Sequence, residues 1–198
     1  MDKSKSFNVR KFVMLALFTA IVVVLQSIGA FIRFGPFSIS LVLLPIVVGA
    51  ALNGMFAGFW LGLVFGLVVL FSGDATVFMG INLPATILVV LGKGAFAGLA
   101  AGTVHKLLAK KGRTVAALAA AIVCPVINTG LFVVGLYAFF WPTISEWGTA
   151  AGFTNTAAYV FLGMIGANFL FEIVVNVVLS PVIVRLVQYA QERRATAS

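Results

Sequence analysis

The chain has 198 residues, of which 62% are hydrophobic and 9% charged, with a formal net charge of +8. This composition lies outside the range of soluble domains and indicates a membrane-embedded protein. The basic excess is explained by membrane topology and attraction to anionic lipid, so it does not point to a nucleic-acid partner. The single cysteine, Cys124, excludes a disulfide framework and a thiolate metal cluster, and it is interpreted as a small packing residue.

Apolar runs divide the chain into six segments that are predicted to span a membrane as helices. A bilayer core requires roughly 20 helical residues, and continuous apolar runs exclude a barrel of alternating strands. The second run is short and contains Pro45, so a thin, bent or partly non-spanning helix is expected there. Residues 1–198 are therefore predicted to form one all-α domain, a six-helix transmembrane bundle. The predicted spans are Phe12–Ile32, Phe37–Leu52, Met55–Phe71, Leu83–Leu107, Thr114–Phe140 and Ala157–Val187.

The distribution of basic residues predicts the orientation of these spans. Positive residues in short loops favour the cytoplasmic side of a membrane. The opposite side has only Arg33, alongside Asp74 and Glu146. Both termini are therefore predicted to be cytoplasmic. The basic residues on the predicted cytoplasmic side are Lys3, Lys5, Arg10, Lys11, Lys106, Lys110, Lys111, Arg113, Arg185, Arg193 and Arg194.

Glycine recurs at every fourth residue in the third and fourth predicted spans. One series consists of Gly54, Gly58, Gly62 and Gly66, and the other of Gly94, Gly98 and Gly102. Such small-residue ridges let helix backbones approach closely in a membrane. The series predict tight packing of these two spans against each other, or alternatively a sliding or docking surface for a partner.

Ionisable residues inside the predicted spans point to a polar site. Lys93 lies about 15 Å along the fourth span, and Glu172 lies halfway along the sixth. Charges at such depth cost at least a few kcal/mol, so they normally face a bundle interior, a partner or a water-filled cavity. Asn168, Glu172 and Asn176 share one helix face through their i, i+4, i+8 spacing, and Asn128 adds a polar group from the fifth span. Spans four to six are thus predicted to line one site.

Two interpretations of these residues remain open. Lys93 and Glu172 could pair only with each other, with the asparagines acting as hydrogen bonds between helices. Alternatively, they bind a ligand, in which case Lys93 suits a carboxylate or phosphate, and Glu172 and the asparagines suit hydroxyl, amide or amine groups.

Enzymatic and metal sites are not indicated. Gly92-Lys93 is followed by Gly94 where a phosphate loop requires Ser or Thr, so no ATPase is encoded. His105 is the only histidine, which leaves no pair for zinc and no plausible catalytic triad. We therefore expect neither catalysis nor a metal site.

The chain resembles the substrate-binding S components of energy-coupling factor (ECF) transporters, in the group with riboflavin, pantothenate and cobalamin binders. The resemblance rests on the size, the six-span plan and the stretch Leu41–Pro45 leading to Gly54–Gly58 and Gly62. It also rests on Ala16-x-x-x-Ala20, which is similar to the motif by which such proteins meet their coupling subunit.

This resemblance implies a capture subunit for a vitamin-like micronutrient, without a motor of its own. The ligand would enter from outside, and the protein would then dock on a coupling subunit bearing two ATPases, which use the ATP. A pantothenate-like acid is the first expected substrate because of Lys93, and riboflavin, stacked on outer aromatics such as Trp141 and Trp147, is the second. The alternatives are a small stand-alone secondary transporter and a membrane assembly or structural protein. The residues implied for the substrate are Lys93, Asn128, Asn168, Glu172, Asn176, Phe34, Asp74 and Asn82, and those for docking are Ala16 and Ala20.

Overall fold

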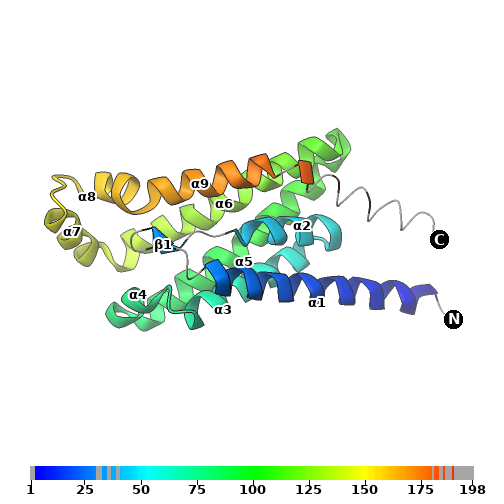
Figure 1. The fold of residues 1–198 in the computed structure, drawn as a ribbon, viewed down its shortest axis with the longest axis horizontal. Coiled ribbons are helices and arrows are strands. Elements are labelled where there is room, and N and C mark those ends of the chain that lie inside the picture. The colour runs from blue at the N-terminus through cyan, green and yellow to red at the C-terminus, as the bar shows by residue number, and fades with distance from the viewer. Residues whose placement is uncertain are drawn as a thin grey trace.

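The computed structural model describes residues 3–29, 33–34, 37–38, 41–179, 181–182, 185 and 189. Apart from one short antiparallel hairpin, the described elements are helices. Figure 1 shows the long helices lying side by side along the longest axis of the molecule. The elements are α1 (Lys3–Gly29), β1 (Arg33–Phe34), β2 (Phe37–Ser38), α2 (Leu43–Asn53), α3 (Met55–Phe71), α4 (Thr76–Ile81), α5 (Leu83–Leu108), a 3₁₀ turn (Ala109–Lys111), α6 (Arg113–Phe139), α7 (Trp141–Ala150), α8 (Thr156–Ala158), a π-helix (Tyr159–Ile165) and α9 (Gly166–Val178).

Within the described residues, four helical stretches are long and apolar enough to cross a membrane. They are Lys11–Gly29, Leu83–Lys111, Arg113–Phe139 and Thr156–Val178. α2 and α3 are shorter apolar helices of 11 and 17 residues. At a rise of about 1.5 Å per residue they measure roughly 16 and 25 Å, less than the ~30 Å hydrocarbon core of a bilayer.

Several predicted boundaries are wrong. The second helix begins at Leu43, whereas Phe37–Ser38 forms strand β2, paired with β1 in the register Phe34 to Phe37 and Arg33 to Ser38. A short apolar run does not distinguish helix from strand, which is why the hairpin was missed. α1 begins at Lys3, because its helix extends beyond the apolar run into polar sequence. Most of the predicted sixth span after α9 lies outside the described residues.

Two segments that lie between the predicted spans contain helices. α4 follows the turn around Asp74, and α7 begins at Trp141 with Pro142 in its first turn, where proline is favoured. In Figure 1 both helices lie at the end of the molecule opposite the start of α1.

The glycine series of α3 and α5 pack the two helices backbone to backbone, as predicted. A Cβ atom on Gly58 would collide with the carbonyl oxygen of Gly98, and one on Gly62 would collide with that of Gly94. Gly54 departs from the predicted ridge: its φ is 97°, it has open space beside it, and it forms the turn between α2 and α3. The two helices therefore pack closest at their glycine positions, where no side chain separates the backbones.

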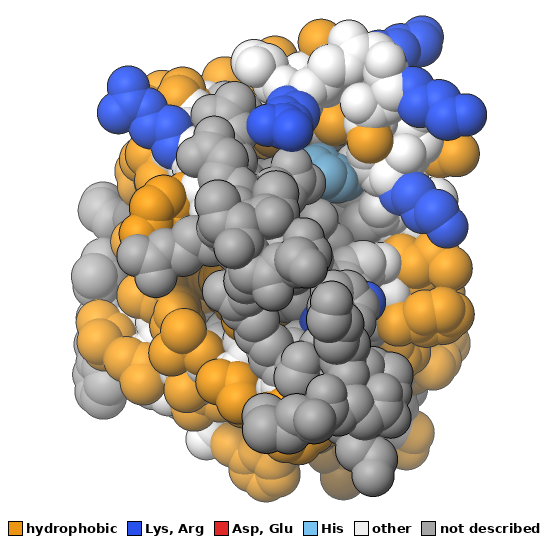
Figure 2. All heavy atoms as spheres, turned by 90° about the vertical axis from the view of Figure 1, so that its right-hand side faces the viewer, with side chains coloured by type: hydrophobic (Ala, Val, Ile, Leu, Met, Phe, Trp, Pro, Cys, Tyr) orange, Lys and Arg blue, Asp and Glu red, His pale blue; other side chains and the backbone are white. Residues whose placement is uncertain are grey.

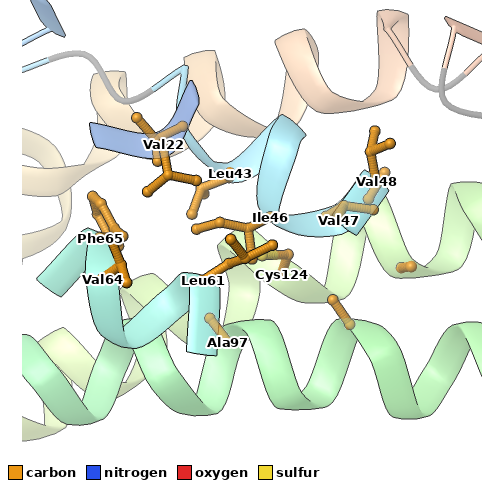
Figure 3. Packing of buried hydrophobic residues seen from close by; sticks show 14 of the residues in the cluster. Val22, Leu43, Ile46, Val47, Val48, Leu61, Val64, Phe65, Ala97 and Cys124 are labelled. Carbon is orange, nitrogen blue, oxygen red and sulfur yellow. The ribbon is translucent and has the colours of Figure 1, made fainter. Parts of the chain in front are cut away.

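The largest buried cluster lies between α2 and its neighbours. Figure 3 shows Leu43 and Ile46 of α2 facing Leu61 of α3, with Cys124 of α6 beside them. Cys124 is fully buried in this cluster, which confirms its interpretation as a packing residue.

Basic side chains gather at one end of the molecule. The end of α5, the 3₁₀ turn and the start of α6 carry exposed Lys106, Lys110, Lys111 and Arg113, and they lie at the same end of the molecule as the start of α1 (Figure 1). Figure 2 views this end directly and shows Lys and Arg along its rim, with no described Asp or Glu side chain visible on this face.

Candidate functional site

A cavity of about 90 Å³ lies within the helix bundle and collects most of the predicted polar residues. It extends to α4 and the turn that precedes it, which places it towards the end opposite the basic one. Of the predicted ligand residues, Asp74, Lys93, Asn128, Asn168 and Glu172 line it. The full lining is Gln26, Phe65, Val69, Asp74, Ala75, Phe78, Val90, Lys93, Asn128, Thr129, Phe132, Met164, Ile165, Asn168 and Glu172.

Lys93 of α5 is partly buried against aromatic rings. Its Nζ lies 4.9 Å from the ring centroid of Phe132 on α6 and 5.7 Å from that of Phe65 on α3. Such cation–π contacts contribute about 0.5–2 kcal/mol, depending on how far they are desolvated. The rings hold the ammonium at the cavity wall without consuming its three hydrogen-bond donors.

Glu172 of α9 is only 2% exposed, yet it is incompletely hydrogen-bonded. Its Oε1 accepts a hydrogen bond from Asn168 Nδ2 at 3.3 Å, whereas Oε2 has no partner in the described part of the chain. Glu172 accepts its hydrogen bond from Asn168, and the Lys93 ammonium contacts the ring of Phe132. Lys93 and Glu172 thus share one cavity without a direct ion pair between them.

Gln26 of α1 is a cavity residue that the sequence analysis missed. It is 2% exposed, and its Nε2 donates a 2.8 Å hydrogen bond to Asp74 Oδ2 in the turn before α4. A lone glutamine among Val and Leu was the available signal, because a buried amide in a membrane helix is expected to find a polar partner. Phe65, Phe78 and Phe132 gave no such signal, since the chain contains 19 phenylalanines.

Asn176, Ala16 and Ala20 are not among the residues that line the cavity. Asn176 is 1% exposed, and its Nδ2 donates to the backbone oxygen of Glu172 at 2.8 Å. The backbone of Phe34 belongs to β1, but its side chain lies outside the described part of the structure. Ala16 and Ala20 are both on the exposed face of α1.

Asn82, which the resemblance implied for the substrate, does not line the cavity and instead caps the start of α5. Its Oδ1 accepts a hydrogen bond from the backbone N of Ala85 at 3.1 Å. The cap fixes where the helix that carries Lys93 begins.

Replacing Asn82 with alanine is expected to lower the stability of the protein by about 1 kcal/mol, because the first turn of α5 loses its side-chain acceptor. A thermal-unfolding measurement on the purified protein checks this. Asn82→Asp, which keeps an acceptor oxygen, should restore most of the stability. An unchanged melting temperature in Asn82→Ala would contradict the capping role.

The chemistry of the site suits binding. It combines one ammonium, two carboxyl groups, three amides and three aromatic rings, and no arrangement of nucleophile and base is found among them. In the described residues no group of three or more His, Cys, Asp or Glu side chains gathers to hold a metal ion. The cavity can therefore hold a small polar molecule by hydrogen bonds and aromatic contact.

A helical, multi-pass membrane protein with an internal polar cavity is typical of transport proteins. The chain matches the family model of the ECF transporter substrate-specific component over residues 10–184, and it belongs to this family. Members are transporter subunits rather than enzymes. Comparison with curated proteins and with solved structures gives no match.

Proposed function

We propose that this protein captures a water-soluble vitamin or related micronutrient for an ECF-type importer. The observation that carries the proposal is the cavity, in which polar residues from α5, α6 and α9 meet. Buried polar groups in membrane helices are costly, and a ligand site explains why several converge at one place. The family match supports the role of a substrate-capture subunit.

Two substrates represent the chemistry that the cavity offers. A pantothenate-like acid would place its carboxylate on the Lys93 ammonium, with hydroxyl and amide groups on the opposite oxygens. Riboflavin would instead use the phenylalanine rings around Lys93. At about 90 Å³ the cavity is smaller than typical ligand pockets, so its walls must separate to admit either molecule.

We further propose a six-span arrangement with both termini in the cytoplasm, in which α2 and α3 are short spans. The basic end shown in Figure 2 supports this orientation through the positive-inside rule. The cavity then lies towards the outer side, where the ligand arrives. Transport would require a coupling subunit and two ATPases, which consume the ATP.

Native mass spectrometry of the gently purified protein tests the capture role. A stoichiometric adduct with the mass of a vitamin supports it and identifies the ligand. A protein without an adduct that also fails to bind any of a panel of vitamins argues for a structural role. Transport by the lone protein in liposomes, driven by an ion gradient, would instead favour the secondary-transporter alternative.

The exposed alanine face of α1 is proposed to contact the coupling subunit. The double variant Ala16→Trp/Ala20→Trp is expected to abolish uptake in cells while ligand binding by the isolated protein is unchanged, because bulky side chains prevent close helix approach. Ile28→Trp, also on exposed α1 surface and about 12 Å further along the helix, is the matched control and should transport normally. Uptake by the double variant at the normal rate would contradict the docking role.

A further inference from the structure

The cavity contains more hydrogen-bond acceptors than the protein satisfies. Three buried oxygens on residues that line it, Gln26 Oε1, Asn128 Oδ1 and Glu172 Oε2, accept no hydrogen bond within the described part of the chain. Their side chains are 2%, 4% and 2% exposed, respectively. A buried polar atom without a partner costs about 1–3 kcal/mol, so three of them in one cavity indicate a molecule that supplies donors.

The neighbouring hydrogen bonds determine how two of these oxygens are presented. The amide nitrogen of Gln26 is occupied by Asp74, so the free end of this side chain is its oxygen. Likewise, Asn168 occupies one oxygen of Glu172 and leaves the other as the available acceptor. The acceptors come from α1, α6 and α9, which surround the cavity on several sides.

The rest of the lining is aromatic and aliphatic. Phe65, Phe78 and Phe132 contribute rings, and the Phe78 and Phe132 rings meet edge to face at a centroid distance of 5.8 Å. Lys93 adds a cation over two of the rings, and this cation can donate to one acceptor on a ligand. A flat molecule could place its apolar faces against these rings and its polar edge against the acceptors and Lys93. An acyclic polyol would instead place hydroxyl groups against the rings.

We propose that the cavity selects a planar nitrogen heterocycle that donates at least two N–H hydrogen bonds to the oxygens of Gln26, Asn128 and Glu172. A carbonyl or anionic oxygen on the same molecule accepts from Lys93. This inference rests on the proposed capture function and narrows its substrate class. It ranks a ring with several N–H groups above both pantothenate, which has no ring, and riboflavin, whose flavin ring carries a single N–H.

Uracil and 1,3-dimethyluracil test the proposal as probes, because they share the ring and both carbonyl groups but differ in the two N–H donors. Saturation-transfer NMR with the protein in lipid nanodiscs, corrected with empty nanodiscs, should show uracil binding at least about 10-fold more tightly. Thymine, which has an added methyl group and keeps both donors, controls for size and should bind like uracil. Equal binding of uracil and its dimethyl derivative would overturn the proposal.

The variant Asn128→Leu provides an independent test on the protein side. Removing an unsatisfied buried oxygen in favour of a similar apolar volume should raise the melting temperature of the ligand-free protein while weakening uracil binding about 5-fold or more. Asn176→Leu is the matched control, since Asn176 also has a buried oxygen without a partner but does not line the cavity. It should bind uracil normally. A lower melting temperature with unchanged uracil binding in Asn128→Leu would show that Asn128 is structural and would overturn its role here.

The native mass spectrum separates failure of this inference from failure of the capture function. A vitamin-mass adduct that contains no N–H-bearing ring would overturn the inference and leave the capture function standing. Absence of any adduct, together with absence of binding by uracil, thymine and the vitamin panel, would overturn both. The probe comparison uses the wild-type protein, so it remains decisive even if a variant fails to fold.

Discussion

Replacing Gly62 with valine is expected to prevent this protein from folding to a monodisperse species. A Cβ at this position meets the backbone of α5, with Gly94 C at 2.6 Å and Ala95 Cα at 3.1 Å. Overpacking typically costs about 1–3 kcal/mol, and more when the neighbouring atoms cannot move. Because those atoms are backbone, we expect a loss of about 3 kcal/mol or more. Size-exclusion chromatography and thermal unfolding measure it.

Gly92 offers a matched control in the facing helix. It lies in α5 two residues before Gly94, and a Cβ there has open space around it. Gly92→Ala should therefore leave the protein folded and could raise its stability by up to about 1 kcal/mol through helix propensity. Normal folding of Gly62→Val would show that α3 and α5 can move apart without a loss of stability, and that their backbone contact is not required for folding.

Replacing Lys93 with methionine is expected to weaken ligand binding by about 10- to 100-fold. A hydrogen bond to a charged group contributes roughly 1.5–3 kcal/mol, and methionine removes it while retaining the length of the side chain. The thioether can still pack against Phe65 and Phe132, so the melting temperature should stay the same or rise. Isothermal titration with the ligand identified by native mass spectrometry provides the affinity.

Lys106 serves as the control for this substitution. It lies in the last turn of the same helix and is exposed, so Lys106→Met should bind the ligand with wild-type affinity. If Lys93→Met unfolds the protein, Lys93 has a structural role and the ligand interpretation loses its main cation. Wild-type affinity in a folded Lys93→Met protein would remove Lys93 from the site altogether.

Long apolar helices were predictable from the sequence, and short or polar ones were not. Met55–Phe71 was predicted with its observed bounds, and Leu83–Leu107 ended one residue before α5 does. Both are long, mainly apolar helices that begin directly after a glycine or an asparagine, and such runs give the clearest helix signal in a sequence. α4 was missed because it has only six residues, and α7 was missed because its residues are mixed in polarity. The hairpin was missed because its strands have only two residues each.

The candidate site was partly predictable for the same physical reason. Charged and amide side chains stand out in apolar helices, so Lys93, Asn128 and Glu172 could be named before their contacts were known. Spacing within one helix could not show that Asn168 and Glu172 line the cavity whereas Asn176 does not. Nor could it show that Gln26 meets Asp74, because these residues are 48 positions apart in sequence. Contacts between distant segments are set by tertiary packing.

The backbone contact between α3 and α5 divides the cavity into a fixed wall and an adjustable one. Phe65 and Lys93 stand on the two helices that this contact locks, so their separation cannot change much when a ligand enters. Asn168 and Glu172 stand on α9, which begins at Gly166 directly after the π-helix, and a Cβ atom on Gly166 would collide with the carbonyl oxygen of Phe161. The wide turn of a π-helix is more easily remodelled than regular α-helix. Ligand-dependent motion should therefore be concentrated at α9, while α3 and α5 stay in place.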